Sequence, residues 1–140
     1  MAIPICKPGV NKRNVAGYFM LGVVNNIGFV IMVAGAKTIA EAAVGLVFLA
    51  NIVPTTLIKL TAPLWFDKLS YNIRLLICVV LMSSSFVVVA LTHEPGPQLG
   101  GVALGSAACG LGEVSFLAMA HHFDSETMLA AWSSGTGLAG

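Results

Sequence analysis

The chain has 140 residues, of which 57% are hydrophobic and only 9% are charged. Soluble globular proteins carry about 25% charged residues, so this chain has too few charges to cover a surface that faces water. Its mean hydropathy of +0.91 agrees, and a net charge of +1 leaves no basic surface for nucleic acid. The composition therefore predicts a chain that lies in a lipid bilayer, and it excludes a soluble or nucleic-acid-binding protein.

Long uncharged stretches divide the chain into expected transmembrane helices. A helix needs about 20 apolar residues to cross the hydrocarbon core of a bilayer, whereas the strands of a membrane barrel would alternate in polarity. We expect an all-α membrane protein in which residues 1–140 form a single transmembrane unit, a fragment of a longer protein. The predicted spans, four complete and the start of a fifth, are residues 15–36, 42–66, 75–93, 98–120 and 128–140.

Positive charges in the connections between spans predict the orientation, because lysine and arginine accumulate on the cytosolic side. Five such residues lie before the first span or between the second and third, whereas Lys37 alone lies in the opposite connections. The five are Lys7, Lys12, Arg13, Lys68 and Arg74. The sequence therefore predicts a cytosolic N-terminus.

Two charged residues, Lys59 and Glu113, interrupt stretches that are otherwise apolar enough to span. Each lies eight residues before a polar boundary, Asp67 or His121, which places both about 12 Å into the membrane at 1.5 Å per residue. An ionisable side chain there costs several kcal/mol, about 2.5–3.5 on insertion scales, and usually faces a protein interior or a cavity. The alternatives are that Lys59 extends to the headgroups, or that the two residues form an ion pair that only holds helices together.

Other polar side chains fall near the same depth, and the whole set predicts a polar layer close to the middle of the membrane. Transporters often place their substrate sites at this level. The alternatives are that the asparagines hydrogen-bond to other helices and that the serines bond to their own helix carbonyls. The residues expected in the layer besides Lys59 and Glu113 are Asn25, Asn26, Ser83–Ser85, Ser133, Ser134 and Thr136.

Proline and glycine mark two further features of the spans. Pro54 lies inside the second span beside Asn51, Thr55 and Thr56; it removes a backbone donor, so we expect a helix kink whose free carbonyl is satisfied by a neighbouring polar side chain. Such a kink either opens the backbone toward a cavity or is passive. In the fourth span, the small residues of Gly101–Gly105 predict close packing against another helix.

The sequence offers no enzymatic or metal-binding motif. His121 and His122 are adjacent and lack the i, i+4 spacing of a helical zinc pair, and the cysteines form no Cys-x-x-Cys pair. We therefore expect no enzymatic activity, no metal and no cofactor.

Four strings of residues resemble the battenin family of lysosomal and vacuolar membrane proteins. They are Gly22–Asn26, Pro54–Pro63, Gly110–Leu117 and Trp132–Gly137, and their order and spacing hold from about Val15 to the end. The resemblance implies the N-terminal part of a multi-pass lysosomal or vacuolar protein, similar to part of the N-terminal half of a major facilitator or equilibrative nucleoside transporter fold. A charged connection around Asp67, Lys68 and Arg74 resembles the loop of the major facilitator superfamily, with Pro63 where that motif has glycine.

The resemblance also implies a function, because the family is linked to lumenal pH, basic amino-acid content and release of glycerophosphodiesters. We expect a transporter of small solutes that works by alternating access. Lys59 is expected to bind an anionic group such as a phosphodiester, and Glu113 to couple to protons or to pair with Lys59; a basic amino acid is the other expected substrate. Expected partners are the bilayer, the substrate, protons and a C-terminal half of the same protein. The alternative is a non-transporting scaffold for organelle trafficking or pH regulation.

Overall fold

The structure is a computed structural model that describes residues 11–35 and 44–140. Lys7, Lys37 and the expected connection 37–41 lie outside the described residues. The described part is helical: α1 (Lys12–Ala34), α3 (Val44–Trp65), the short 3-10 helix η2 (Phe66–Lys68), α4 (Tyr71–Leu91), α5 (Pro95–Ala120) and α6 (Ser125–Ala139). Four of these helices, α1, α3, α4 and α5, are long and apolar enough to cross a membrane. The prediction of an all-helical protein with four spanning helices is confirmed.

Four helices begin earlier than the uncharged stretches suggested: α1 at Lys12, α4 at Tyr71, α5 at Pro95 and α6 at Ser125. The reason is that a charge ends an apolar run without ending the backbone hydrogen-bond ladder. At the start of α1, the side chain of Asn11 accepts a 3.0 Å hydrogen bond from the N–H of Arg13 and caps the helix. Proline suits the first turn of α5, because its missing N–H has no partner there in any helix.

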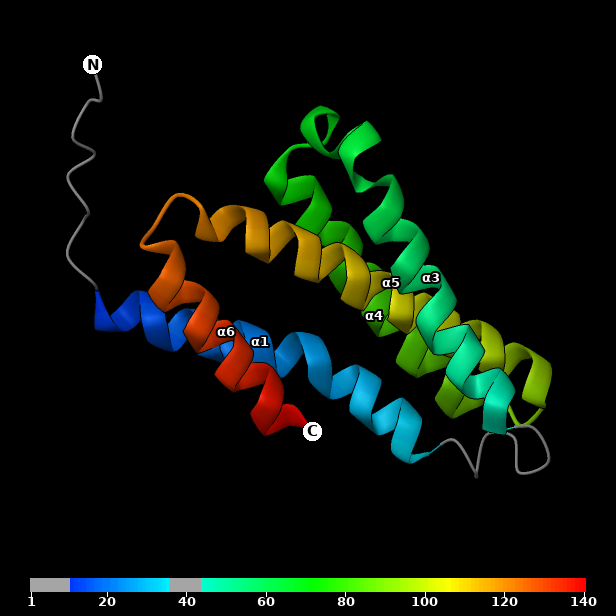
Figure 1. Ribbon diagram of the computed structural model, residues 1–140. Coiled ribbons are helices and arrows are strands. Elements are labelled where there is room, and N and C mark those ends of the chain that lie inside the picture. Colours follow the sequence, from blue (N-terminus) through cyan, green and yellow to red (C-terminus); the bar gives the residue numbers. More distant parts are fainter. Residues whose placement is uncertain (1–10, 36–43) are drawn as a thin grey trace, which may run out of the picture.

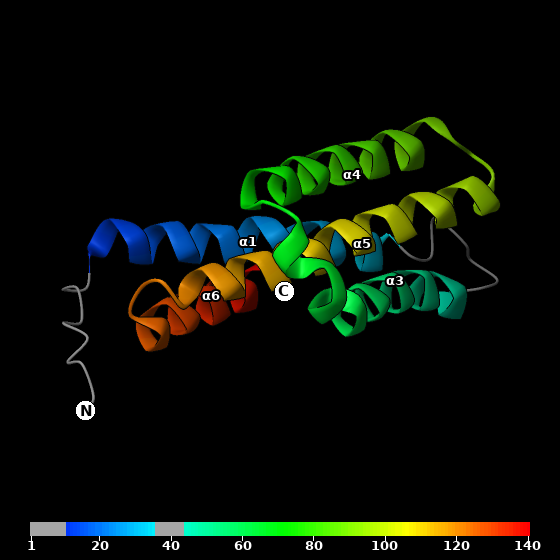
Figure 2. The ribbon, with the colours of Figure 1, turned by 90° about the horizontal axis from the view of Figure 1, so that it is seen from above.

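Helix α5 is the centre of the arrangement, and it packs against α4, α3 and α1. Figure 2 shows α5 between α4 on one side and α3 on the other, and Figure 1 shows α6 lying along α1. More than half of the membrane-spanning window of α5 is buried, against 11% in α3 and in α4. The outer helices therefore expose most of their apolar surface, as expected for a protein in lipid.

Glycines on two faces of α5 explain how it packs so closely. A Cβ atom added at Gly101 would lie 2.7 Å from a methyl group of Val89, and one at Gly105 would lie 2.6 Å from the hydroxyl of Ser85, both on α4. The predicted close packing of Gly101–Gly105 is thereby confirmed. A third small residue, Gly110, faces Thr55 on α3 in the same way.

Two apolar clusters lie toward opposite ends of the helices. One joins α1, α5 and α6 through residues that include Tyr18, Phe116 and Trp132, and the other joins α1, α3 and α5 through Met32, Val47 and Val102. Along α1 and along α5, the polar residues that contact other helices lie between these clusters. The fold thus places interhelical polar contacts between two apolar layers.

Candidate functional site

Lys59 and Glu113 form an ion pair between α3 and α5. The Nζ atom of Lys59 lies 2.8 Å from Oε2 of Glu113. Lys59 lies six residues before the last residue of α3 and Glu113 seven before the last residue of α5, about 9 and 10.5 Å at 1.5 Å per residue. The two residues therefore lie at similar distances from the ends of their helices, and the structure brings them together.

The ion pair is only partly covered by the described residues. The side chain of Lys59 is 41% exposed and that of Glu113 is 30% exposed. Lys59 also lines an open depression of about 470 Å³ between α3 and α5, whose other walls are mostly apolar. A charged pair facing hydrocarbon is costly, so lipid chains are an unfavourable neighbour for this face of the molecule.

Ser106 of α5 bridges the turn of α3 that follows Pro54. The N–H of Thr55 donates a 3.3 Å hydrogen bond to Oγ of Ser106, and the hydroxyl of Ser106 donates to the carbonyl of Asn51. The Thr55 N–H and the Asn51 carbonyl are the two groups that pair with each other in a regular α-helix. The helix α3 continues through Pro54. We expected a polar neighbour of Pro54 in the same helix to bond to the backbone at this turn, whereas the bonding side chain, Ser106, comes from α5.

Thr56, one of those neighbours, bonds only within its own helix. Its hydroxyl donates a 2.8 Å hydrogen bond to the carbonyl of Ile52. This carbonyl already has a regular helical donor four residues later, so the bond does not compensate for the N–H that proline lacks.

Asn25 ties α1 to α5. Its Nδ2 donates to the carbonyl of Cys109 at 3.2 Å, and the thiol of Cys109 donates to the carbonyl of Asn25 at 3.2 Å. Asn25 is 8% exposed, and a Cβ atom added at Gly112 would run into its Oδ1 atom. Cys109 lies one turn before Glu113 on α5, so this contact adjoins the ion pair along the helix.

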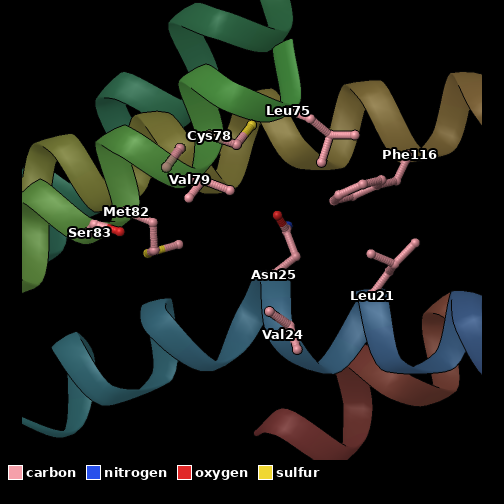
Figure 3. A pocket seen from close by; sticks show the side chains of 10 residues that line it. Leu21, Val24, Asn25, Leu75, Cys78, Val79, Met82, Ser83 and Phe116 are labelled. Atoms are coloured by element: carbon pink, nitrogen blue, oxygen red, sulfur yellow. The ribbon is translucent and has the colours of Figure 1, made fainter. Parts of the chain in front are cut away.

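Asn25 also lines a cavity of about 350 Å³ between α1, α4 and α5. Figure 3 shows Asn25 rising from α1 toward Cys78 and Met82 of α4, with Phe116 of α5 to one side. The lining is almost entirely apolar, and its size falls in the range of small-molecule pockets. Neither residue of the ion pair lines this cavity, so the structure separates the charges from it.

Asn26, the next residue, points to a different helix. Its Nδ2 donates to the hydroxyl of Thr136 on α6 and to the carbonyl of Gly22, each at 3.0 Å. Ser133 and Ser134 are exposed on α6, and Ser134 donates to the carbonyl of Ala130 in its own helix. The structure therefore joins Thr136 to the polar layer and places the two serines apart from it.

Three residues of the layer were not expected to have these roles: Asn51, Ser106 and Cys109. Ser106 and Glu113 are seven positions apart, two turns of helix, and therefore share one face of α5. This seven-residue spacing can be read from the sequence, and it indicates that Ser106 and Glu113 face the same neighbouring helix. Nothing in the sequence indicates that Cys109 would exchange hydrogen bonds with Asn25. Within residues 11–35 and 44–140, no three histidine, cysteine or acidic side chains form a group that could hold a metal ion.

Comparison with known proteins identifies the family. The model of the family described as CLN3 protein matches residues 16–140. Battenin of Canis lupus familiaris is 34% identical over 162 residues, covering 94% of this chain and 37% of battenin. Protein BTN1 of Yarrowia lipolytica is 38% identical over 127 residues, covering 89% of this chain and 32% of that protein.

The chain thus spans about a third of the length of these relatives. No solved structure matches it. The match over nearly the whole chain, together with four helices able to cross a bilayer, shows that this chain is a multi-pass membrane protein of the battenin (CLN3 protein) family.

Proposed function

We propose that the chain is part of a lysosomal or vacuolar transporter for small solutes, in which Lys59 binds an anionic group of the substrate. The observation that carries this proposal is the ion pair between Lys59 and Glu113, with a 2.8 Å separation and both side chains partly exposed. A pair at this depth is costly unless it has a polar environment or a role. An aqueous pathway against this face of α3 and α5 would supply that environment.

The chemistry of the pair suits an anionic substrate. In the resting state, Glu113 neutralises Lys59, and an anion such as a phosphodiester competes for the same ammonium group. Glu113 is then the proton-coupling residue, and alternating access of the helices carries substrate and proton across the membrane.

The decisive test is a flux assay on vesicles that contain the full-length protein. Uptake of a glycerophosphodiester and of a basic amino acid is compared with and without a pH gradient. We expect saturable phosphodiester flux that is lost in Lys59→Ala and retained in the matched control Lys68→Ala, which removes an exposed lysine of η2. Normal flux in a correctly inserted Lys59→Ala variant would disprove the proposed role.

A structural scaffold is the second candidate, and the pairing of the polar residues favours it. Lys59 pairs with Glu113, Asn25 with Cys109 and Asn26 with Thr136, so each side chain has a partner on another helix. In a scaffold, exchanging the charges in Lys59→Glu/Glu113→Lys should restore both abundance and biological activity. In a transporter, the exchange should restore abundance without flux, because the cation then lies on the other helix.

A further inference from the structure

We propose that Ser106 is a positioning residue that holds Lys59 in register with Glu113 by fastening a hinge of α3 at Pro54. The expected effect of Ser106 on transport rests on the proposed function of Lys59. The hinge in α3 does not depend on that function. The structural basis is the pair of hydrogen bonds through which Ser106 joins Thr55 and Asn51.

The backbone of α3 lacks a hydrogen bond at this turn, as it does again at its second internal proline, Pro63. Pro54 has no N–H to donate to the carbonyl of Ala50, so one bond of the ladder is missing. At the next position, the Thr55 N–H and the Asn51 carbonyl are both engaged by the Ser106 hydroxyl. Helices bend where proline removes a donor, and the Ser106 hydroxyl contacts both groups of the next step of the ladder.

The hinge and the ion pair are linked through α5. Ser106 and Glu113 lie on one face of that helix, about 10.5 Å apart along its axis. On α3, Lys59 follows Thr55 by one turn. On α5, Gly110 lies between Ser106 and Glu113 and lets the backbones of the two helices approach, since a Cβ atom there would lie 2.9 Å from Cα of Thr55. Because α5 carries both contact points, the bond at Ser106 fixes where the following turn of α3 places Lys59.

Asn51 provides an independent sign that this turn can rearrange. The residue is 1% exposed, and no acceptor among the residues that the structure describes reaches its Nδ2 atom. A buried donor without an acceptor costs free energy. In this arrangement of the turn the Asn51 amide lacks an acceptor, and a rearranged turn could supply one.

The hinge is tested first by hydrogen exchange on the full-length protein in nanodiscs. Ser106→Ala removes two hydrogen bonds and leaves the Thr55 N–H and the Asn51 carbonyl to pair with each other, a net loss of about one. Amide exchange in residues 51–59 should therefore accelerate by about two- to tenfold. The matched control is Ser115→Ala, a second buried serine of α5 whose hydroxyl has no partner among the described residues. Adding Pro54→Ala to Ser106→Ala restores a regular ladder, so exchange should return toward the wild-type rate. Equal exchange in Ser106→Ala and Ser115→Ala would overturn the hinge.

The positioning of Lys59 is tested separately, without any transport measurement. In a background in which the native Cys6, Cys78 and Cys109 are replaced by serine, cysteines replace Lys59 and Glu113, and a short bis-methanethiosulfonate reagent reports how often the two positions approach. Adding Ser106→Ala should slow this cross-linking severalfold, whereas adding Ser115→Ala should not. Unchanged cross-linking alongside faster exchange would show a hinge that does not position Lys59, and would overturn the proposal.

Flux then connects the hinge with the proposed function. This measurement uses the protein that keeps Lys59 and Glu113, without the introduced cysteines. Ser106→Ala should raise KM for the phosphodiester severalfold with little change in maximal rate, because the ammonium group of Lys59 is still present but is misplaced. If the wild-type protein shows no flux, the proposed function fails while exchange and cross-linking still decide the hinge. If wild-type flux is saturable and Ser106→Ala leaves KM unchanged, the positioning role fails while the proposed function stands.

Discussion

The amide of Asn26 donates a 3.0 Å hydrogen bond to the hydroxyl of Thr136, joining the first membrane-spanning helix to α6, 110 positions further along the chain. Asn25, the preceding residue, bonds instead to Cys109 on α5. Two consecutive asparagines thus fasten α1 to two different helices. Because α6 packs along α1 and meets α5 mainly through side chains such as Phe116 and Trp132, α1 is the main link between α6 and the rest of the described structure.

Removing the Thr136 hydroxyl should weaken this link by a measurable amount. Thr136→Val keeps the shape of the side chain and deprives Asn26 of one of its two acceptors, the other being the carbonyl of Gly22. We expect a loss of about 0.6 kcal/mol and at most about 1.7 kcal/mol, the range for interhelical hydrogen bonds in membranes. The measurement is unfolding in mixed detergent micelles.

The control for that change is Thr56→Val, because the Thr56 hydroxyl bonds only to its own helix. It should leave stability almost unchanged. Equal losses in the two variants would show that the contact between Asn26 and Thr136 contributes nothing specific.

Two glycines of α6 provide a sharper comparison. A Cβ atom added at Gly135 would run into the carbonyl oxygen of Phe19 on α1, whereas one added at Gly137 meets nothing within 4 Å. Gly135→Ala should force α1 and α6 apart and cost about 1–3 kcal/mol, as overpacking usually does. Gly137→Ala should be neutral or stabilising by up to about 1 kcal/mol, since alanine favours a helix.

Thermal unfolding of both glycine variants in the same detergent checks this prediction. A similar melting temperature for the two would mean that α1 and α6 are not packed backbone to backbone. The contact of α1 with α6 would then have to rest on side chains such as Trp132.

A cation–π contact stabilises the turn between α3 and α4. Cζ of Arg74 lies 3.8 Å from the centroid of the Phe66 ring. Phe66→Leu should lower stability by about 0.5–2 kcal/mol, and Arg74→Lys should also lose stability because an ammonium group lacks the planar face that stacks on the ring. Phe48→Leu is the matched control, since Phe48 is exposed on α3. Equal unfolding midpoints for the two leucine variants would argue against a stabilising role for the ring.

Much of this architecture can be predicted from the sequence, because the bilayer sets strict limits on composition and length. Long uncharged runs identify the four spanning helices, and equal distances from polar boundaries place Lys59 and Glu113 at one depth. The exact helix ends differ because charged and interfacial residues such as Lys12 and Tyr71 remain helical. The cost of a charge in lipid and the formation of a backbone hydrogen bond are separate effects.

The choice of partners could not be predicted in the same way. Depth follows from counting residues along one helix, whereas contacts depend on how each helix is rotated about its axis, which its neighbours decide. Asn25 and Asn26 differ by one position and face different helices, and the hydroxyl of Ser134 bonds only within its own helix. Ser106 is a further case, since its role depends on Pro54 of another helix.

The ion pair itself yields the last prediction, through a cycle of neutral variants. Lys59→Met and Glu113→Gln should each destabilise the protein, because each leaves the remaining charge at membrane depth without its partner. The double variant should lose less than the sum of the two, since no charge remains there; interaction energies of this kind between contacting residues run from about 0.5 to 3 kcal/mol. Unfolding in detergent measures all four proteins under one condition, with Lys68→Met as the control for removing a lysine outside the spans. Strict additivity would mean that the 2.8 Å pair contributes no coupling, and that each charge is stabilised by its own surroundings.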